Sequence, residues 1–194
     1  NAGGGRDRAV LHTLKGSLYD AATGSKAVDD NGSYISAETT FTASSSGSGT
    51  ASVTYSFDAE TLGGAVLTAY ADVILDGRTV SFERDSEETA QQIRFPKIET
   101  ELTDEFNGTH YAGSGQNLVY LQDCVVYKNL KPDSSYTLEG ILYDTDTGEP
   151  ALDSNGETIT ASQTFTTGAG TYAEGRAYVY YYFHTDSSLA GKTY

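Results

Sequence analysis

The sequence has little positive charge and almost no cysteine. Cys124 is the single cysteine among 194 residues, so no disulfide can form within the chain. Twelve lysine and arginine residues stand against 27 aspartate and glutamate residues, which gives a formal net charge of -15. Nucleic-acid binding depends on cationic side chains that neutralise phosphates, so we expect no nucleic-acid partner. No apolar run approaches the roughly 18 residues of a membrane-spanning helix, so we also expect no membrane insertion of this stretch.

Methionine and tryptophan are absent, and the sequence lacks every common catalytic motif. The three histidines, His12, His110 and His184, are scattered, with no cysteine or acid at the spacing of zinc ligands. There is no nucleophile elbow, phosphate-binding loop or zinc-protease helix motif. We therefore predict that the protein is not a turnover enzyme, and that it has no metal site and needs no cofactor.

What the sequence does contain is a long internal repeat. Residues 13–42, TLKGSLYDAATGSKAVDDNGSYISAETTFT, match residues 137–166, TLEGILYDTDTGEPALDSNGETITASQTFT, without a gap. Seventeen of these 30 positions are identical, at an offset of 124. A period of this length is that of a small domain rather than of a solenoid unit, so the chain is a tandem array. Two whole copies would need about 248 positions, so we expect both copies to be truncated.

The remaining patterns predict an all-β protein. Two-residue alternation with β-branched and aromatic residues marks six strands: 52–57, 65–70, 79–82, 118–121, 125–127 and 177–183. Asn-Gly, Asp-Gly and Thr-Gly pairs between them favour tight hairpin turns. Residues 86–92 carry only a weak helix-start pattern and are expected to form a turn. The spacing predicts tandem immunoglobulin-like antiparallel β-sandwich domains.

We place the domain boundary just before Phe95 and Pro96, because proline suits a linker or the beginning of a strand. Residues 1–94 are then the C-terminal part of a first sandwich, and residues 95–194 the N-terminal part of a second. Asp144, Asp146 and Gly148 have the spacing of a calcium loop, but the repeat keeps only Asp20 and Gly24 at the matching positions, which favours a hairpin turn.

Two strands carry side chains with more than one interpretation. The tyrosines at 178, 180, 181 and 182 should alternate between core and solvent, and exposed rings can form a sugar or protein contact site. The simpler explanation is that these tyrosines supply large rings to a core that contains no tryptophan. Cys124 is expected to be a small buried apolar residue rather than a reactive thiol.

The amino-acid sequence of the second repeat resembles that of a known family. The segments PKIETELTD, DCVVYKNLKPDSSYTLEGILYDTDTGEP and ITASQTFTT, in this order, resemble the Thr-Gln ester-bond domains of Gram-positive surface adhesins, also called VaFE repeats. The similarity covers the chain apart from residues 1–8. Thirteen positions of the family pattern D-x-V-x-Y-x-N-L-x-P-G-x-x-Y-x-L-x-G-x-L-x-D-x-x-T-G fall on this sequence, from Asp123 to Gly148, and Asp133 replaces the usual glycine after the proline.

The resemblance implies a self-made cross-link. In the family, a threonine hydroxyl on the first strand attacks the carboxamide of a glutamine on the last strand, which expels ammonia and leaves an ester. Alignment of the motifs puts the nucleophile at Thr100, with Thr103 as the fallback, and the reacting glutamine at Gln91. Nearby acids that burial keeps protonated would polarise the amide, and a base would take the hydroxyl proton.

The assisting residues depart from the family pattern at two places. Glu88 and Asp85 match the acids that precede the glutamine, but Glu83 stands where the family has its histidine and Ala71 where it has a glutamate. Gln91 closes the first repeat and Thr100 opens the second. We therefore expect no ester between these two residues within one folded unit.

Together these patterns predict a structural stalk segment of an extracellular, cell-wall-anchored adhesin. Its partners would be neighbouring repeats of the same protein, with a host ligand contacted through other domains. The alternative is a ligand-binding adhesin module that itself contacts a host glycan or protein.

Overall fold

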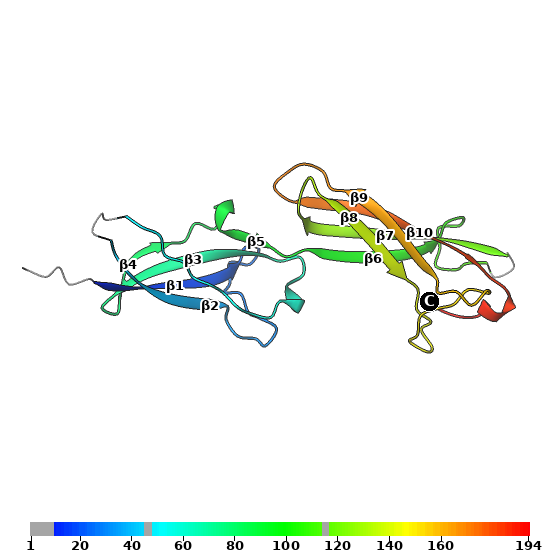
Figure 1. Ribbon diagram of the computed structural model, residues 1–194, viewed down its shortest axis with the longest axis horizontal. Helices are drawn as coiled ribbons and strands as arrows, with labels where there is room; N and C mark the ends of the chain where they lie inside the picture. The colour runs from blue at the N-terminus through cyan, green and yellow to red at the C-terminus, as the bar shows by residue number, and fades with distance from the viewer. Residues whose placement is uncertain (1–9, 45–47, 114–116) are drawn as a thin grey trace, which may run out of the picture. The chain divides into compact units, whose positions relative to one another are not determined.

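The computed structural model describes residues 10–44, 48–113 and 117–194. These residues form antiparallel strands and three short 3-10 turns, with no α-helix among them. The chain separates into two compact units, Asn1–Phe95 and Pro96–Tyr194. The predicted all-β fold with antiparallel sheets in two tandem domains is confirmed (Figure 1). None of the helical turns in the described ranges is long and apolar enough to cross a membrane.

The first unit is built on one antiparallel sheet. Its elements are β1 (Leu11–Asp20), β2 (Ser36–Thr42), η1 (Glu60–Leu62), β3 (Val66–Leu75), β4 (Arg78–Glu83), η2 (Thr89–Gln91) and β5 (Gln92–Arg94). The strand order is β2-β1-β3-β4, and β5 pairs with the beginning of β3 (Figure 1). Asp76 and Gly77 join β3 to β4 and both have positive φ, as a two-residue hairpin with the natural twist requires.

The core of the first unit is small. Leu18 of β1 and Leu67 of β3 are buried there, with Ala27 and Ile35 from the connection between β1 and β2. Residues 52–57 pack on this core with alternating burial, yet they form no strand, so this sequence prediction was wrong. The reason is the missing ladder: strand structure needs a hydrogen-bonded neighbour, and the alternation alone does not supply one.

The second unit has two sheets that face each other. Its elements are β6 (Lys97–Asp104), β7 (Leu118–Leu130), β8 (Ser135–Ile141), β9 (Thr160–Thr166), β10 (Ala173–His184) and η3 (Ser187–Leu189). One sheet has the order β10-β7-β6, and the other pairs β8 with β9 (Figure 1). Leu121 and Val179 from the first sheet pack against Leu142 and Ile159 from the side of the second, which makes a two-layer core.

The repeat seen in the sequence is also a repeat of structure. β1 corresponds to β8 and β2 to β9, at the constant offset of 124. η1 corresponds to η3, and each is followed by a glycine with positive φ, Gly64 and Gly191. In the first unit the Ala21 N–H donates to Val66 O at 2.8 Å. In the second the Thr145 N–H donates to Thr193 O at 3.0 Å. Thr193 and Tyr194 therefore stand where β3 begins in the first unit.

Each unit contains a tyrosine placed over a glycine. A Cβ atom at Gly16 would collide with the Tyr55 hydroxyl, and one at Gly140 would collide with the Tyr181 hydroxyl. Burial raises the pKa of both phenols, which keeps them neutral. The two glycines occupy matching strands, β1 and β8, so close packing of a ring edge on backbone is a property of the domain rather than of one copy.

The remaining predicted strands lie within longer observed ones. Residues 65–70 lie mostly in β3 and 79–82 in β4, while 118–121 and 125–127 belong to one strand, β7. Residues 177–183 lie in β10, where Tyr181 is buried and Tyr178 and Tyr182 are exposed, as alternation requires. Residues 86–92, expected to form a turn, contain the 3-10 helix η2, which Glu88 caps.

Candidate functional site

Thr100 lies on the inner face of the second unit's larger sheet. In β6 it stands directly opposite Val125 of β7, and opposed residues in an antiparallel pair point to the same side. Val125 is 3% exposed and forms part of the buried interior, so this is the core side. Thr100 itself is exposed. Its hydroxyl thus sits on a core-facing position that remains open to solvent and to an approaching group.

Asp123 is a carboxylic acid on the same inner face. It lies two residues before Val125 in β7, opposite Leu102 of β6 and Val179 of β10. Burial raises its pKa, and a backbone hydrogen bond from Glu101 partly opposes this shift. Its Oδ1 atom is enclosed and has no hydrogen-bond partner in the described part of the chain. The fold therefore favours a neutral acid one diagonal position from Thr100.

Sequence reasoning did not assign Asp123 a role in the site. From the sequence, Asp123 is the first position of the D-x-V-x-Y pattern. The available signal was an acid at an inward position of an alternating strand, between the buried residues Leu121 and Val125. Such a position is costly for a charged group and is typical of a functional acid.

Gln91 is the last residue of η2 in the first unit, not a member of a strand as the resemblance implied. Its backbone N–H donates to Glu88 O at 3.0 Å, which fixes the turn just before β5. The side chain is half-buried, and its Oε1 atom is enclosed without a hydrogen-bond donor among residues that the structure describes. An amide oxygen left unpaired in this way can still accept a bond from an acid.

The three predicted assisting acids are exposed and bind nearby backbone. Glu88 Oε1 accepts from the Ala90 N–H at 3.0 Å. Asp85 Oδ1 accepts from the Glu87 N–H at 2.9 Å, and Glu83 Oε1 from the Asp85 N–H at 3.1 Å. In this conformation these carboxylates hold the turn that leads to Gln91.

The two departures from the family pattern are neighbours in space. Ala71 of β3 and Glu83 of β4 stand directly opposite each other in the ladder. Ala71 is also opposite Gly16, on the face that packs under Tyr55. Glu83 therefore lies on the strand next to Ala71, the position at which the family pattern has a glutamate.

Gln91 and Thr100 belong to different units. The first unit ends at Phe95 and the second begins at Pro96, so each unit contains one of the two residues that the resemblance assigns to a cross-link. The first unit holds the amide and the acids near it. The second holds the hydroxyl and Asp123.

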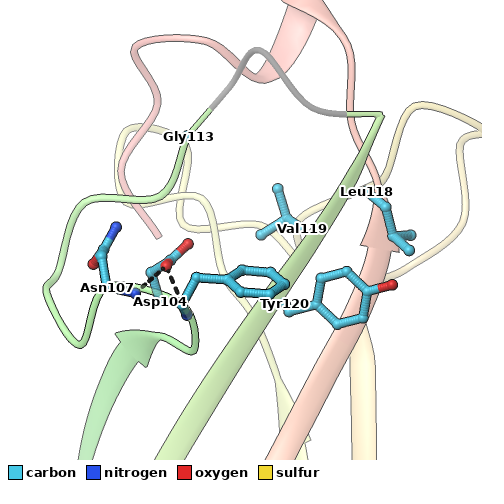
Figure 2. Close-up of a pocket in the computed structure, with 7 residues that line it drawn as sticks. Asp104, Asn107, Gly113, Leu118, Val119 and Tyr120 are labelled. Carbon is cyan, nitrogen blue, oxygen red and sulfur yellow. Dashed lines mark hydrogen bonds between the residues drawn. The ribbon is translucent and has the colours of Figure 1, made fainter.

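A pocket lies in the second unit where β6 ends and β7 begins. Figure 2 shows its lining, which includes Asp104, Asn107 and Tyr120. Asp104 is buried, and its Oδ1 atom accepts from the N–H groups of Phe106 and Asn107, both at 3.0 Å. The acid thus closes the turn after β6 and is not turned toward the hollow as a free ligand.

The segment with the spacing of a calcium loop, Asp144 to Gly148, is a hairpin turn, and so is its counterpart, Asp20 to Gly24. Asp144 Oδ1 accepts from the Asp146 N–H at 3.0 Å, and its Oδ2 receives Lys192 Nζ at 2.9 Å. The lysine lowers the pKa of Asp144. Asp20 caps the matching turn through the Ala22 and Thr23 N–H groups. No group of three acids, histidines or cysteines suited to a metal occurs in the described ranges.

Replacement of Asp123 by asparagine tests the buried acid. A carboxyl whose folded pKa is raised destabilises the native state once it ionises, so its cost is absent below the unfolded pKa and grows as pH rises through the folded pKa. We expect Asp123→Asn to raise the melting temperature by a few degrees at pH 8 and to change it little at pH 3. Thermal unfolding followed by circular dichroism at both pH values measures this. An equal shift at both would show that Asp123 does not titrate abnormally.

Comparison with known proteins gives one family. The family model described as "T-Q ester bond containing domain" matches residues 9–95 and again residues 96–190. No curated protein and no solved structure matches the chain.

Proposed function

Because the chain belongs to the family of T-Q ester bond containing domains, with two copies in tandem, we propose that it is a stalk segment of a cell-surface adhesin. Its domains space a distal binding region from the cell wall and resist tension and proteolysis. The partners of each domain are the neighbouring copies. The observation that carries the proposal is the tandem pair of all-β units, each of which matches the model of this family.

The cross-link chemistry assigns Thr100 as nucleophile and Gln91 as the amide in their respective domains. Thr Oγ forms a bond to the amide carbon, the C–N bond breaks, and the hydroxyl proton leaves with the nitrogen as ammonia. No cofactor or oxidant is needed. Held in contact, the two groups gain an effective molarity equivalent to about 7 to 11 kcal/mol of barrier.

Asp123 supports the assignment of Thr100. A neutral carboxyl on the inner face can donate a hydrogen bond to the amide oxygen as negative charge develops there. Around Gln91, Glu88 and Asp85 order the turn, and Glu83 is the base from the strand opposite Ala71. The event happens at most once in a domain that contains both the threonine and the glutamine, so it is not turnover catalysis.

The cross-link is tested on a longer chain in which the second unit carries its own copy of Gln91. Because Tyr194 corresponds to Leu67, residues 68–95 are repeated after Tyr194, which supplies the second unit with a copy of β3 to β5 and of Gln91. We expect the intact mass to fall by one ammonia relative to the sequence, and Thr100→Ala to abolish this loss. Thr103→Ala is the matched control and should leave the loss unchanged. The 194-residue chain should show its full sequence mass.

Two outcomes would contradict the assignment. A full, unmodified mass in the extended chain, with the added strands shown to be folded by hydrogen exchange, would remove the cross-link. Loss of ammonia that survives Thr100→Ala but not Thr103→Ala would move the nucleophile to Thr103.

A second candidate function rests on an aromatic row on the outer face of β7 and β10. The ring centroids of Tyr120 and Tyr182 are 5.1 Å apart, and those of Tyr182 and Tyr180 are 6.3 Å apart. Phe106 packs edge-on against Tyr120 at 5.3 Å. Flat exposed rings of this kind can contact a sugar or a protein. Specific binding on a glycan array that Tyr182→Ala removes would favour a ligand-binding module over a stalk.

A further inference from the structure

The two units share the inner face of one segment and differ on its outer face. Residues 177–183 of β10, AYVYYYF, correspond to residues 51–57, ASVTYSF, because Tyr181 and Tyr55 each lie over a matching glycine. The inward residues of the two segments, Ala, Val, Tyr and Phe, are identical. At the outward positions the first unit has Ser52, Thr54 and Ser56, whereas the second has Tyr178, Tyr180 and Tyr182. The domain core therefore does not require the three outward rings of the second unit.

These tyrosines lie on the outer face of the sheet β10-β7-β6. Their neighbours in β10, Val179 and Tyr181, are buried, and successive side chains of a strand point to opposite faces. Tyr178 is 40% exposed and Tyr182 is 56% exposed. In the first unit β3, β4 and β5 extend the sheet of β1, which is the counterpart of β8. Strands of that kind therefore belong to the other layer and leave this face open.

Pairing within the sheet accounts for only part of the aromatic row. Tyr182 stands opposite Tyr120 of β7, and such a ring pair stabilises an antiparallel sheet. Tyr180 stands opposite Gln122, and Tyr178 opposite Cys124, so neither has a ring across the ladder. The ring planes of Tyr180 and Tyr182 are within 9° of parallel. The row thus presents ring faces that sheet pairing alone does not explain.

Glu105 lies beside the aromatic row. Its backbone N–H donates to Tyr120 O at 3.0 Å. Desolvation raises the pKa of Tyr182, and the negative charge of Glu105 raises it further, so the carboxylate lies near this phenol. Glu105 is exposed and forms no ion pair with a lysine or arginine of the described ranges. Its charge is therefore available to a cation that meets the ring.

Glu101 supplies a second acid on the same face. In β6 it stands opposite Cys124, which in turn stands opposite Tyr178, so the three side chains share one side of the sheet. The Glu101 side chain is 69% exposed, and its Oε1 atom lies 3.9 Å from His110 Nε2, an ion pair only when the imidazole is protonated. Two carboxylates therefore border the exposed rings.

Exposed ring faces next to carboxylates select a cationic occupant. The face of an aromatic ring attracts cations, and a guanidinium group both stacks on a ring and pairs with a carboxylate through two parallel hydrogen bonds. A second copy of this chain would bring a net charge of -15 against itself, which opposes association. Charge complementarity thus favours a basic peptide, and the flat rings favour arginine within it.

We propose that the aromatic row, extended by Tyr178 and bordered by Glu101 and Glu105, binds an arginine-bearing peptide segment of another protein. The guanidinium groups stack on Tyr178, Tyr180 and Tyr182 and pair with the two carboxylates. This inference rests on the second candidate function, the ligand-binding module, and names the class of its partner. It needs no reaction at the cross-link residues.

The test uses the intact 194-residue chain and two labelled peptides of equal charge, one alternating arginine with glycine and one alternating lysine with glycine. Fluorescence anisotropy should show the arginine peptide binding about fivefold more tightly. Tyr178→Ser, Tyr180→Thr and Tyr182→Ser, made together, copy the outward residues of the first unit and keep the net charge at neutral pH. This variant should bind the arginine peptide about tenfold more weakly, with hydrogen exchange in β7 showing that the sheet remains folded.

Single changes provide the controls. Tyr178→Ser alone should weaken binding about threefold, because its exposed ring has no ring across the ladder to stabilise the sheet. Glu105→Gln should weaken binding by a similar factor. Glu139→Gln makes the same change of charge at an exposed position of β8 and should leave the affinity unchanged.

Four results would overturn the proposal. They are absence of binding, equal affinity for the lysine peptide, equal binding by the folded triple variant, and equal losses in Glu105→Gln and Glu139→Gln, since the last two would reflect net charge alone. Sugar binding that the triple variant removes, without peptide binding, would reject the arginine site and uphold the ligand-binding module. Peptide binding without ammonia loss in the extended chain would uphold the arginine site and reject the cross-link.

Discussion

Gly140→Ala is expected to lower the free energy of unfolding of the second unit by about 3 kcal/mol, which corresponds to a fall of about 15 °C in its melting temperature. The added methyl group would occupy the position of the Tyr181 hydroxyl and would also approach the ring carbon that bears it. Tyr181 is 3% exposed, so the ring cannot swing away without disturbing the closely packed core between the sheets. Gly140 has no positive φ, so backbone strain is not the cause.

The collision predicts a specific rescue. Tyr181→Phe removes the oxygen that the methyl group would strike, so Gly140→Ala combined with Tyr181→Phe should recover about half of the lost stability. Gly148→Ala tests the opposite case, because Gly148 has a positive φ and open space around it. Urea unfolding of the single and double variants measures the coupling. Additive losses in the double variant would mean that the hydroxyl contact is not the source of the effect.

Leu67→Ala should destabilise the first unit by about 3 kcal/mol. Leu67 is 1% exposed and is the β3 member of a core cluster with four buried apolar residues among those that the structure describes. A cavity in so small a core has few neighbours that can move to fill it, and a domain of this size has roughly 5 to 15 kcal/mol in total. Hydrogen exchange should therefore speed up at β1 and β3, whereas amides of β7 and β10 serve as an internal reference.

Val80→Ala is the matched control for this change. Val80 lies on β4 and is 55% exposed, so its truncation should alter stability by less than about 0.5 kcal/mol. If Leu67→Ala were as mild as Val80→Ala, the cluster around Leu67 would not be the core of the unit.

The ungapped match between residues 13–42 and 137–166 predicted that two copies of one domain are present, and the glycine turns within them were correct. The strands of these segments, β1 and β2 in the first unit and β8 and β9 in the second, were not among the six strands that the alternation predicted. Residues 52–57 alternate between apolar and polar side chains as clearly as β10 does, yet they form no strand in the described part of the chain. Periodicity reports which side chains face a core, whereas strand structure also depends on a neighbour that the local sequence does not reveal.

The candidate site was predictable in its position and less so in its chemistry. The motif alignment put Thr100 on an early strand, and register then showed that its side chain faces inward. The resemblance implied a strand at Gln91, whereas the local pattern of residues 86–92 predicted a turn, and Gln91 ends the 3-10 helix η2 there. Asp123 was missed because a raised pKa follows from burial, and burial depends on the opposing sheet.

The correspondence between the units has a practical consequence for detecting further copies. Gly16 and Gly140 are 124 positions apart, Tyr55 and Tyr181 are 126 apart, and Gly64 and Gly191 are 127 apart. An alignment of the sequence with itself at one constant offset therefore matches β1 and β2 with β8 and β9 but misaligns the rest of the domain. Two added residues fall between Thr42 and Tyr55 as compared with their counterparts, and one between Tyr55 and Gly64. A distant copy is better recognised by the glycine and the tyrosine that pack together than by their spacing. A side chain at the glycine would collide with the tyrosine ring, so neither residue can be replaced without the other.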